Sequence, residues 1–346
     1  MTSTLTATPF TGLGVALATP FSSGSSADGQ VRKPQVDHAA YERLIRHVLA
    51  DGRGVDYLVV LGSTGEAATV TDVERHALIR QAVELTRQPT RDAGRSTPLP
   101  VVVGIGHNDT ERTCELAAQA AAAGADGLLV VTPYYNKPQV SGLVAHYSAV
   151  ADAAPGLPII AYNVPGRTGC SLTPTAMRQI WAVDQVVALK ESSGDLRQIA
   201  QLCQQAPAGR AILAGDDDLA LASIAVGAQG LVSVCANVAP VETAELVAAA
   251  RAGEMDTARE RFALLAPLMA ALFAETNPVP VKAALACLGL TSASVRLPLS
   301  PAEPGTWTGV QSALADLQAA RRQATGTWSS TTRMPAIPAS PAALVS

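Results

Sequence analysis

The 346-residue chain lacks several patterns by which a sequence reveals its class. It holds no run of about 18 apolar residues, so we expect no helix that spans a membrane. Lysine and arginine form no block and the formal net charge is −4, so nothing predicts binding to nucleic acid or to an anionic membrane. The five histidines fall in no HxH or HExxH spacing, and we expect no metal. These absences leave a small molecule as the expected partner.

Cysteine is also scarce, and its pattern argues against disulfides. The five residues are odd in number, widely spaced and form no CxxC motif. They are Cys114, Cys170, Cys203, Cys235 and Cys287. A secreted disulfide framework would need paired cysteines at close spacing. The pattern therefore predicts a reducing, cytoplasmic location.

What the chain does have is alternation between short apolar runs and longer helical segments. Hydrophobic residues make up 48% of it and charged residues 16%, enough to bury a large core. Runs rich in Val, Ile and Leu followed by helices are typical of a parallel sheet covered by helices. The eight runs are Leu13–Ala18, Tyr57–Leu61, Pro100–Ile105, Gly127–Val131, Pro158–Tyr162, Val186–Lys190, Ala211–Ala214 and Gly230–Val234. Eight such units in about 240 residues predict an α/β fold of the closed (β/α)₈ TIM-barrel type.

The main alternative fold is a Rossmann domain, which needs a glycine-rich fingerprint at its first βα turn. The nearest segment, Gly104-Ile-Gly106-His-Asn-Asp109, lacks the third glycine and comes too late in the chain. The sequence therefore argues against a dinucleotide cofactor.

Beyond about residue 240 the strand patterns cease and helical stretches follow, near 241–252, 254–273, 279–288 and 306–324. We expect the first to close the barrel and the others to form an appended C-terminal helical region. The predicted division is 1–11 as a flexible N-terminus, 12–252 as the catalytic barrel, 253–324 as the helical region and 325–346 as a flexible tail. Ser22–Asp28 and Gln88–Pro98 lack periodicity and are predicted surface loops.

Four strand ends are unusually polar, and in a (β/α)₈ barrel the carboxyl ends of the strands face the active site. The four segments are Leu61-Gly62-Ser63-Thr64-Gly65-Glu66, Thr132-Pro133-Tyr134-Tyr135-Asn136-Lys137-Pro138, Tyr162-Asn163-Val164-Pro165-Gly166-Arg167-Thr168-Gly169 and Lys190-Glu191-Ser192-Ser193-Gly194-Asp195. A lysine at the mouth of an apolar barrel can lose its proton and become a nucleophilic amine, and a nearby tyrosine can carry protons. Lys190 and Tyr162 fit these two roles.

Each segment alone has an ordinary structural explanation. Ser63 could cap a helix, Tyr134 and Tyr162 could be surface and core aromatics, and Arg167 and Lys190 could pair with carboxylates. Their occurrence together at successive strand ends favours the catalytic interpretation.

The same segments resemble the dihydrodipicolinate synthase (4-hydroxy-tetrahydrodipicolinate synthase) family of the pyruvate-dependent class I aldolase, or N-acetylneuraminate lyase, superfamily. The resemblance covers roughly residues 12–300. It continues through Ala-Gly-Asp-Asp at 214–217, Gly-Leu-Val-Ser-Val at 230–234 and Glu-Thr-Asn-Pro-Val-Pro-Val-Lys at 275–282. It implies a lyase or synthase that uses a covalent imine and no separate cofactor, in a homotetramer built from dimers. Lys282 also stands in a family motif, and we interpret it as structural.

Carried over to this chain, the family mechanism makes Lys190 the amine that condenses with pyruvate. The resulting imine would tautomerise to an enamine, the carbon nucleophile, with Tyr162 moving protons. A hydroxyl of Ser63 or Thr64 would link Tyr162 to Tyr135, which the family contributes from a neighbouring subunit. The resemblance thus implies a relay of hydroxyl groups.

Substrate binding is likewise implied by the resemblance. Thr64 and backbone groups of Gly215 and Val232 would lie near pyruvate. A guanidinium holds a carboxylate with two hydrogen bonds, so Arg167 suits the aldehyde L-aspartate 4-semialdehyde in lysine and diaminopimelate synthesis. Ser63 is a departure, because the synthase usually has threonine there and several lyase relatives have serine.

Two other functions remain open on the sequence. A paralogous aldolase acting on a 2-keto-3-deoxy sugar acid or sialic acid would share the imine but typically lacks arginine at position 167. A catalytically silent barrel that binds a keto acid would form no imine at all.

Regulation is a further departure. Family members inhibited by lysine bind it with histidines and an acidic residue, and the corresponding places here hold Asp72, Arg75 and Arg112, although Asn108 and Tyr134 remain. Arginine in place of a carboxylate repels the ammonium groups of lysine. We therefore predict weak or absent feedback by lysine.

Overall fold

The computed structural model describes residues 10–22, 33–50, 54–88 and 98–324. Most of the predicted loops Ser22–Asp28 and Gln88–Pro98 (residues 23–28 and 89–97), the first nine residues and the predicted tail 325–346 lie outside the described residues.

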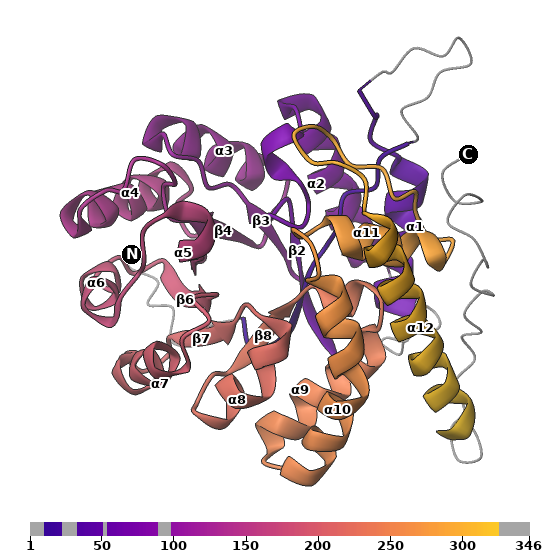
Figure 1. Cartoon of the computed structure of the whole chain (residues 1–346). Coiled ribbons are helices and arrows are strands. Elements are labelled where there is room, and N and C mark those ends of the chain that lie inside the picture. Colours follow the sequence, from indigo (N-terminus) through magenta and orange to yellow (C-terminus); the bar gives the residue numbers. More distant parts are fainter. Residues whose placement is uncertain (1–9, 23–32, 51–53, 89–97, 325–346) are drawn as a thin grey trace.

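Eight parallel strands form a closed barrel in chain order (Figure 1). They are β1 (Gly12–Ala16), β2 (Val55–Val60), β3 (Val101–Gly104), β4 (Gly127–Val131), β5 (Ile159–Asn163), β6 (Val186–Glu191), β7 (Ala211–Ala214) and β8 (Gly230–Ser233). Strand β1 pairs with both β2 and β8, which closes the sheet. The predicted (β/α)₈ TIM barrel is confirmed.

The strands form where the apolar runs are because each strand is covered on both sides. In a barrel, one face of a strand packs inside and the other meets the outer helices, so both faces must be apolar. Every residue of β6 is buried, including Lys190 and Glu191 at its end. Strand β2 begins at Val55, two residues before the predicted start at Tyr57. The prediction began late because the exposed Asp56 interrupts the apolar run.

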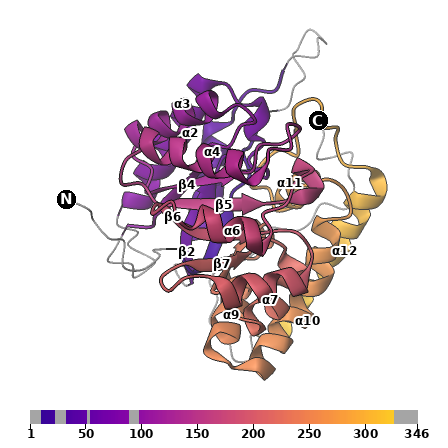
Figure 2. The ribbon, with the colours of Figure 1, turned by 90° about the vertical axis from the view of Figure 1, so that its left-hand side faces the viewer.

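The first helices surround this barrel (Figure 2). They are α1 (His38–Ala50), α2 (Asp72–Arg87), α3 (Thr110–Ala122), α4 (Val140–Ala153), α5 (Pro165–Thr168), α6 (Pro174–Ile180), α7 (Leu196–Gln205), α8 (Ala220–Ala225) and α9 (Pro240–Ala252), with single 3₁₀ turns η1 (Ala67–Thr69), η2 (Asp217–Leu219) and η3 (Cys235–Asn237). Asp109 caps α3, its carboxylate accepting a hydrogen bond from the backbone N–H of Glu111. Thr71 and Glu74 form a capping box at the start of α2, which fixes the chain entering that helix.

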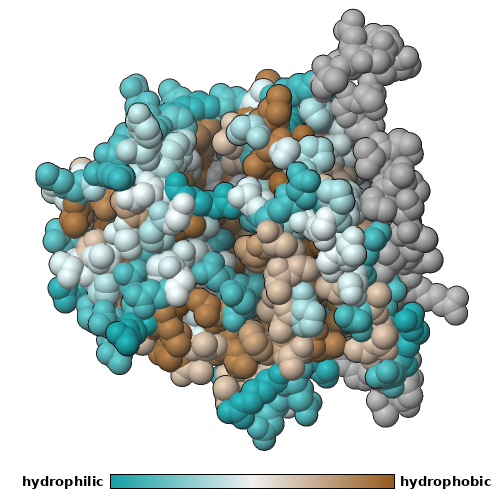
Figure 3. Space-filling model, in the orientation of Figure 1, coloured by the Kyte–Doolittle hydropathy of each residue, from teal (hydrophilic) through white to brown (hydrophobic). Residues whose placement is uncertain are grey.

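The predicted C-terminal helices are α10 (Met255–Leu272), α11 (Val279–Cys287) and α12 (Pro304–Ala324). Helix α10 packs against α9 and α12, and α11 against α12. Every residue of α11 is buried, so this helix is part of the protein interior and holds the preceding segment 275–278 in place. Within the described chain, no helix is long and apolar enough to cross a membrane. The face seen in Figure 1 carries hydrophilic residues with smaller hydrophobic patches between them (Figure 3).

Candidate active site

Lys190 and Tyr162 lie side by side at the ends of neighbouring strands. They are register partners in the parallel pair β5 and β6, and such partners point to the same face of a sheet. Each is only 6% exposed, and the Lys190 Nζ lies 4.4 Å from the centroid of the Tyr162 ring. The two residues that the sequence singled out are therefore in contact.

Three carboxyl groups stand near Lys190, two of them buried (Asp217 and Glu191) and one half-buried (Asp216), yet none forms an ion pair with it among the described residues. Burial raises the pKa of Asp217 to about 6, against hydrogen bonds from Ser233 and the backbone. Burial also raises the pKa of Asp216, where the nearby Lys190 charge acts in the opposite direction. It raises the pKa of Glu191 as well. The amine is thus not occupied by a carboxylate, as the alternative interpretation of Lys190 required.

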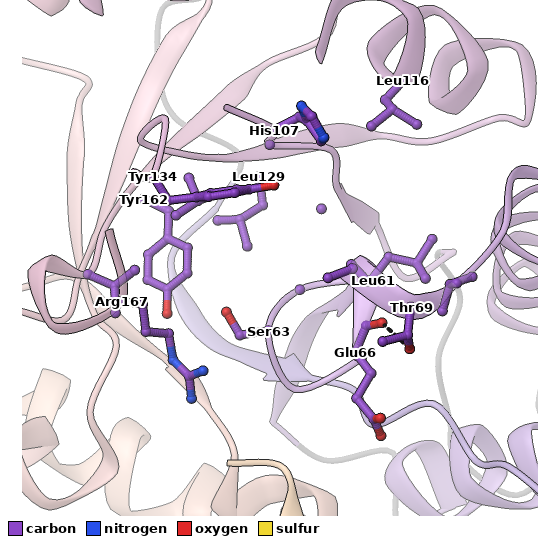
Figure 4. Close-up of a pocket in the computed structure, with 18 of the residues that line it drawn as sticks. Leu61, Ser63, Glu66, Thr69, His107, Leu116, Leu129, Tyr134, Tyr162 and Arg167 are labelled. Atoms are coloured by element: carbon purple, nitrogen blue, oxygen red, sulfur yellow. Dashed lines mark hydrogen bonds between the residues drawn. The ribbon is translucent and has the colours of Figure 1, made fainter. Parts of the chain in front are cut away.

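The Ser63-Thr64 segment follows β2 in a tight turn between Leu61 and Glu66, which both have left-handed backbone angles (φ 57° and 49°). Figure 4 shows the Ser63 side chain and the Tyr162 hydroxyl pointing into the same space. Thr64 is buried, and its hydroxyl oxygen accepts a hydrogen bond of 2.9 Å from the Asn277 side chain. The turn therefore brings the Ser63 hydroxyl to the region of Tyr162 and holds the Thr64 hydroxyl against Asn277.

Arg167 lies in α5, directly after β5, and its guanidinium donates a 3.0 Å hydrogen bond to the backbone oxygen of Asn277. The side chain lies beside Tyr162 and Ser63 in Figure 4. No carboxylate pairs with it among the described residues, so its remaining N–H groups are available to an anionic ligand. This is the arrangement expected of a carboxylate-binding arginine.

Gly215 follows β7 at a point of close approach to Lys190. A Cβ at this position would lie 1.8 Å from the Ser192 Oγ and 3.0 Å from the Lys190 Cε, so only glycine fits. Val232 is buried in β8, where it pairs with Gly14, and no described contact joins it to Lys190. The structure brings Gly215 to the lysine and leaves Val232 one strand further round the barrel.

Tyr135 does not meet Tyr162 within the chain. It is 88% exposed and has a left-handed backbone (φ 72°). Its neighbour Tyr134 instead lines the cavity, with its ring centroid 6.0 Å from that of His107. The predicted role of Tyr135 depends on a neighbouring subunit, so it stays a prediction.

A cavity of about 520 Å³ opens beside these residues. Ser63, Tyr162, Arg167 and Asn277 line one part of it, while Lys190 does not line it but contacts the lining residue Tyr162. The cavity contains both a proton-carrying hydroxyl and a guanidinium, which suits an acidic carbonyl compound. Among the described residues, no group of side chains could hold a metal ion.

Two features of the site were missed on the sequence. Asn277 links Thr64 to Arg167 through its side chain and its backbone oxygen. Beneath the same turn, the buried Glu66 pairs with Lys282, and burial lowers the pKa of Lys282 to about 8 against the attraction of that carboxylate. Glu66 stands in the motif at 62–66, and Asn277 and Lys282 stand in the motif at 275–282. Only the fold shows that these two motifs meet.

The sequence and structure match known proteins over most of the chain. A family model for the dihydrodipicolinate synthetase family matches residues 9–317. A 4-hydroxy-tetrahydrodipicolinate synthase of Thermotoga neapolitana is 44% identical over 301 residues, 86% of this chain and 95% of the relative. One of Salinibacter ruber is 44% identical over 293 residues, 84% of this chain and 90% of the relative. The crystal structure of dihydrodipicolinate synthase from Thermotoga maritima is 39% identical with a TM-score of 0.81, over 90% of this chain and 99% of that one. The chain belongs to the dihydrodipicolinate synthetase family.

Proposed function

We propose that the protein condenses pyruvate with L-aspartate 4-semialdehyde to give 4-hydroxy-tetrahydrodipicolinate, in lysine and diaminopimelate synthesis. The observation that carries this proposal is the contact between Lys190 and Tyr162 at the end of two strands, in a chain of this family. An amine next to a phenol is the pair that imine chemistry requires.

In the proposed reaction, the neutral amine of Lys190 attacks the C2 carbonyl of pyruvate. The carbinolamine then loses water to form an imine, and Tyr162 moves the protons of these two steps. Loss of a C3 proton gives the enamine, whose C3 forms the new bond to the aldehyde carbon while the aldehyde oxygen takes up a proton. The amino group from the semialdehyde finally attacks C2, which closes the ring and releases Lys190. One water leaves in total, and the imine itself is the electron sink, so the chemistry calls for no separate cofactor.

The two carboxylates of the substrates have separate proposed partners. Thr64 accepts its hydrogen bond from Asn277, which leaves its own proton free to donate to the pyruvate carboxylate. Backbone groups near Gly215 and Val232 would border the same substrate. Arg167, with no carboxylate partner among the described residues, would bind the carboxylate of the semialdehyde.

The relay between Tyr162 and solvent would run through the Ser63 hydroxyl to Tyr135 of a second copy. The exposure of Tyr135 beside the cavity supports this, because a side chain held out in a left-handed turn can reach a neighbouring subunit. We propose a homotetramer built from dimers and a cytoplasmic location. The five unpaired cysteines accord with that compartment.

The central test is covalent trapping. Borohydride added with pyruvate should attach the reduced pyruvyl group to Lys190, located by peptide mass mapping, and should leave Lys282 unmodified. The Lys190→Ala variant should form no adduct and show no turnover. An adduct in that variant would place the imine on another amine and rule out the role of Lys190. No adduct in the unsubstituted protein would rule out the mechanism and favour a silent keto-acid-binding barrel.

The second test separates the synthase from a sugar-acid or sialic acid lyase, which Ser63 keeps as an alternative. Pyruvate is assayed with L-aspartate 4-semialdehyde and, in parallel, a 2-keto-3-deoxy sugar acid is assayed for cleavage. Arg167→Ala should lower kcat/KM for the semialdehyde by about tenfold to a hundredfold, because a charge-assisted hydrogen-bonded pair contributes about 1.5–3 kcal/mol. Turnover of the sugar acid with no effect of Arg167→Ala would favour the lyase.

A further inference from the structure

The strand pair β5–β6 ends in two polar residues that the proposed reaction does not use. Asn163 and Glu191 are register partners, and each comes one residue after the partners Tyr162 and Lys190. Successive side chains of a strand point to opposite faces, so the polar pair faces the outer helices while the reacting pair faces the barrel interior. Both polar side chains are buried. The two pairs therefore share the same strand ends, on opposite faces.

The register of β5 and β6 changes along the pair. Ile159 lies opposite Val186, whereas Ile160 lies opposite Ala188. Strand β6 therefore contains one extra residue, Val187, at its start. Such an insertion re-aims the side chains that follow it. The pair thus begins in one register and ends in another, and its start does not fix its end.

The second register is the one that brings the amine to the phenol. If the first register continued, Tyr162 would lie opposite Leu189, and Lys190 would point to the other face of the sheet. A slip of one residue exchanges the two faces of a strand in this way. A specific contact at the end of the pair would hold β6 in the second register.

The contact between Asn163 and Glu191 has this specificity, because its hydrogen bonds have fixed directions. The Asn163 side-chain oxygen accepts a 2.8 Å hydrogen bond from the Leu172 backbone N–H, which turns the NH₂ group toward Glu191. That group donates to both carboxylate oxygens, at 3.0 and 2.8 Å. The Ser193 backbone N–H (2.8 Å) and the Gln198 side chain (3.4 Å) donate to the same carboxylate. In the described chain all its partners are donors, and no cation pairs with it.

The absence of a cation beside this carboxylate indicates what the pair contributes. Desolvating a carboxylate is costly, so an uncompensated buried one is a poor source of stability, whereas its directed hydrogen bonds specify one arrangement of the two strands. We propose that Asn163 and Glu191 are positioning residues, whose hydrogen-bonded pair holds β5 and β6 in the register that places Lys190 against Tyr162. The inference rests on the proposed imine at Lys190, and neither positioning residue contacts the substrate.

Glu191→Gln tests the pair with almost no change in side-chain shape. Either orientation of the new amide sets one N–H donor against another, from Asn163 or from Ser193. The readout is the rate at which pyruvate alone forms the borohydride-trapped adduct, measured by rapid mixing and intact-protein mass well below the melting midpoint. This rate should fall by about tenfold to a hundredfold, since a displacement of about 1 Å between reacting groups can have an effect of that size.

The double variant Asn163→Asp with Glu191→Gln exchanges donor and acceptor and should restore the rate. The new carboxylate at position 163 can accept from the Leu172 N–H and from the new amide, whose oxygen accepts from the Ser193 N–H. The rate should return to within about threefold of that of the unsubstituted protein. A contribution to stability alone would give no such loss and recovery in folded protein.

Glu242→Gln is the matched control, because this buried carboxylate pairs with Arg321 and belongs to α9, which packs against β1 and β8. It should lower the melting midpoint and change the rate by less than about twofold. The proposal is overturned if folded Glu191→Gln forms the adduct as fast as the unsubstituted protein, or if the double variant stays as slow as the single one. If Glu191→Gln does not fold, Asn163→Ala, which keeps the Ser193 hydrogen bond to the carboxylate, replaces it with the same expected loss. Absence of the adduct from the unsubstituted protein would overturn the proposed reaction as well, so the two failures are distinguishable.

Discussion

Two lysines of this chain are buried, Lys190 at the end of β6 and Lys282 in α11. Substituting each with methionine should separate an effect on catalysis from an effect on stability. Lys282 is 0% exposed, pairs with Glu66 and donates a 2.8 Å hydrogen bond to the Ser294 oxygen. Lys190 contacts the Tyr162 ring and has no ion-pair partner among the described residues. Methionine keeps much of the length of both side chains and removes the charge together with the N–H donors of the amine.

The expected loss for Lys282→Met follows from the partner left behind. Glu66 would keep one 3.0 Å hydrogen bond, from the Arg296 backbone, while its carboxylate stays buried. Removing one member of a buried ion pair costs about 3–5 kcal/mol. With an unfolding entropy of about 2.1 cal/mol/K per residue, the 346 residues give about 0.7 kcal/mol/K, so the melting midpoint should fall by about 4–7 °C. Lys190→Met should shift the unfolding free energy by less than about 1 kcal/mol while abolishing the pyruvate adduct.

Calorimetric melting and borohydride trapping on the same preparations provide the readouts. The double variant Glu66→Gln with Lys282→Met should recover about 2 kcal/mol or more of the loss, because no uncompensated charge is then buried. A loss below about 1 kcal/mol for Lys282→Met, or an equal loss for Lys190→Met, would refute the reasoning. So would a Lys282→Met variant that no longer forms the adduct although it is folded.

The pH dependence of that pair gives an independent check. Burial lowers the pKa of Lys282 from 10.5 to about 8. Between about pH 8 and 10.5 the unfolded chain then binds a proton that the folded chain lacks, so the free energy of unfolding contributed by this group rises with pH. The difference in stability between the unsubstituted protein and Lys282→Met should grow across this window. A difference that shrinks there would contradict the lowered pKa.

Three further predictions concern single contacts. Asn277→Ala removes the 2.9 Å hydrogen bond to Thr64, worth about 1 kcal/mol, and should raise the KM for pyruvate about fivefold in steady-state assays with little change in kcat; an unchanged KM would argue against the positioning role. The Arg296 guanidinium lowers the pKa of Glu74 from 4.5 to about 2, so the stabilisation that this group contributes is present above pH 4.5 and is lost as the pH falls toward 2. In thermal melts recorded across this pH range, the Glu74→Gln variant should lack this part of the loss of stability. Lysine titrated into the activity assay should inhibit weakly or not at all, since Arg112 repels its ammonium groups, and strong inhibition at sub-millimolar lysine would contradict this.

The fold could be predicted from the sequence because each strand is short, apolar and followed by a helix. All eight predicted runs are strands, and β4 and β7 match the predicted bounds. The observed strand ends differ from the predicted ones where the strand includes a polar residue, as at Asp56 in β2 and Glu191 in β6. Glu191 could be included because the Asn163 side chain and the Ser193 backbone donate hydrogen bonds to its buried carboxylate. Those partners lie elsewhere in the chain, so periodicity alone gives no sign of them.

The candidate site was predictable only in part, for a reason of sequence distance. Lys190 and Tyr162 sit in adjacent strands whose register follows from the barrel, so their contact is expected once the fold is known. Asn277 lies more than 200 residues from Thr64, just before α11, a helix whose docking no local pattern specifies. Nothing in the sequence marks Asn277, since its role depends on its contacts with Thr64 and Arg167 in the folded chain.

Asn277 also changes how the C-terminal helices should be understood. The sequence predicted an appended helical region, yet the buried helix α11 holds Asn277 against Thr64 and Arg167, and holds Lys282 against Glu66. Thr64 and Glu66 belong to one tight turn. Asn277, just before α11, contacts this turn through a hydrogen bond, and Lys282, within α11, contacts it through an ion pair. A shift of α11 would therefore displace two groups at the same time: the Thr64 hydroxyl, which we propose binds pyruvate, and the Arg167 guanidinium, which we propose binds the aldehyde. Because this region contacts the candidate site, we expect substitutions at the packing surface of α11 to alter the KM for both substrates together.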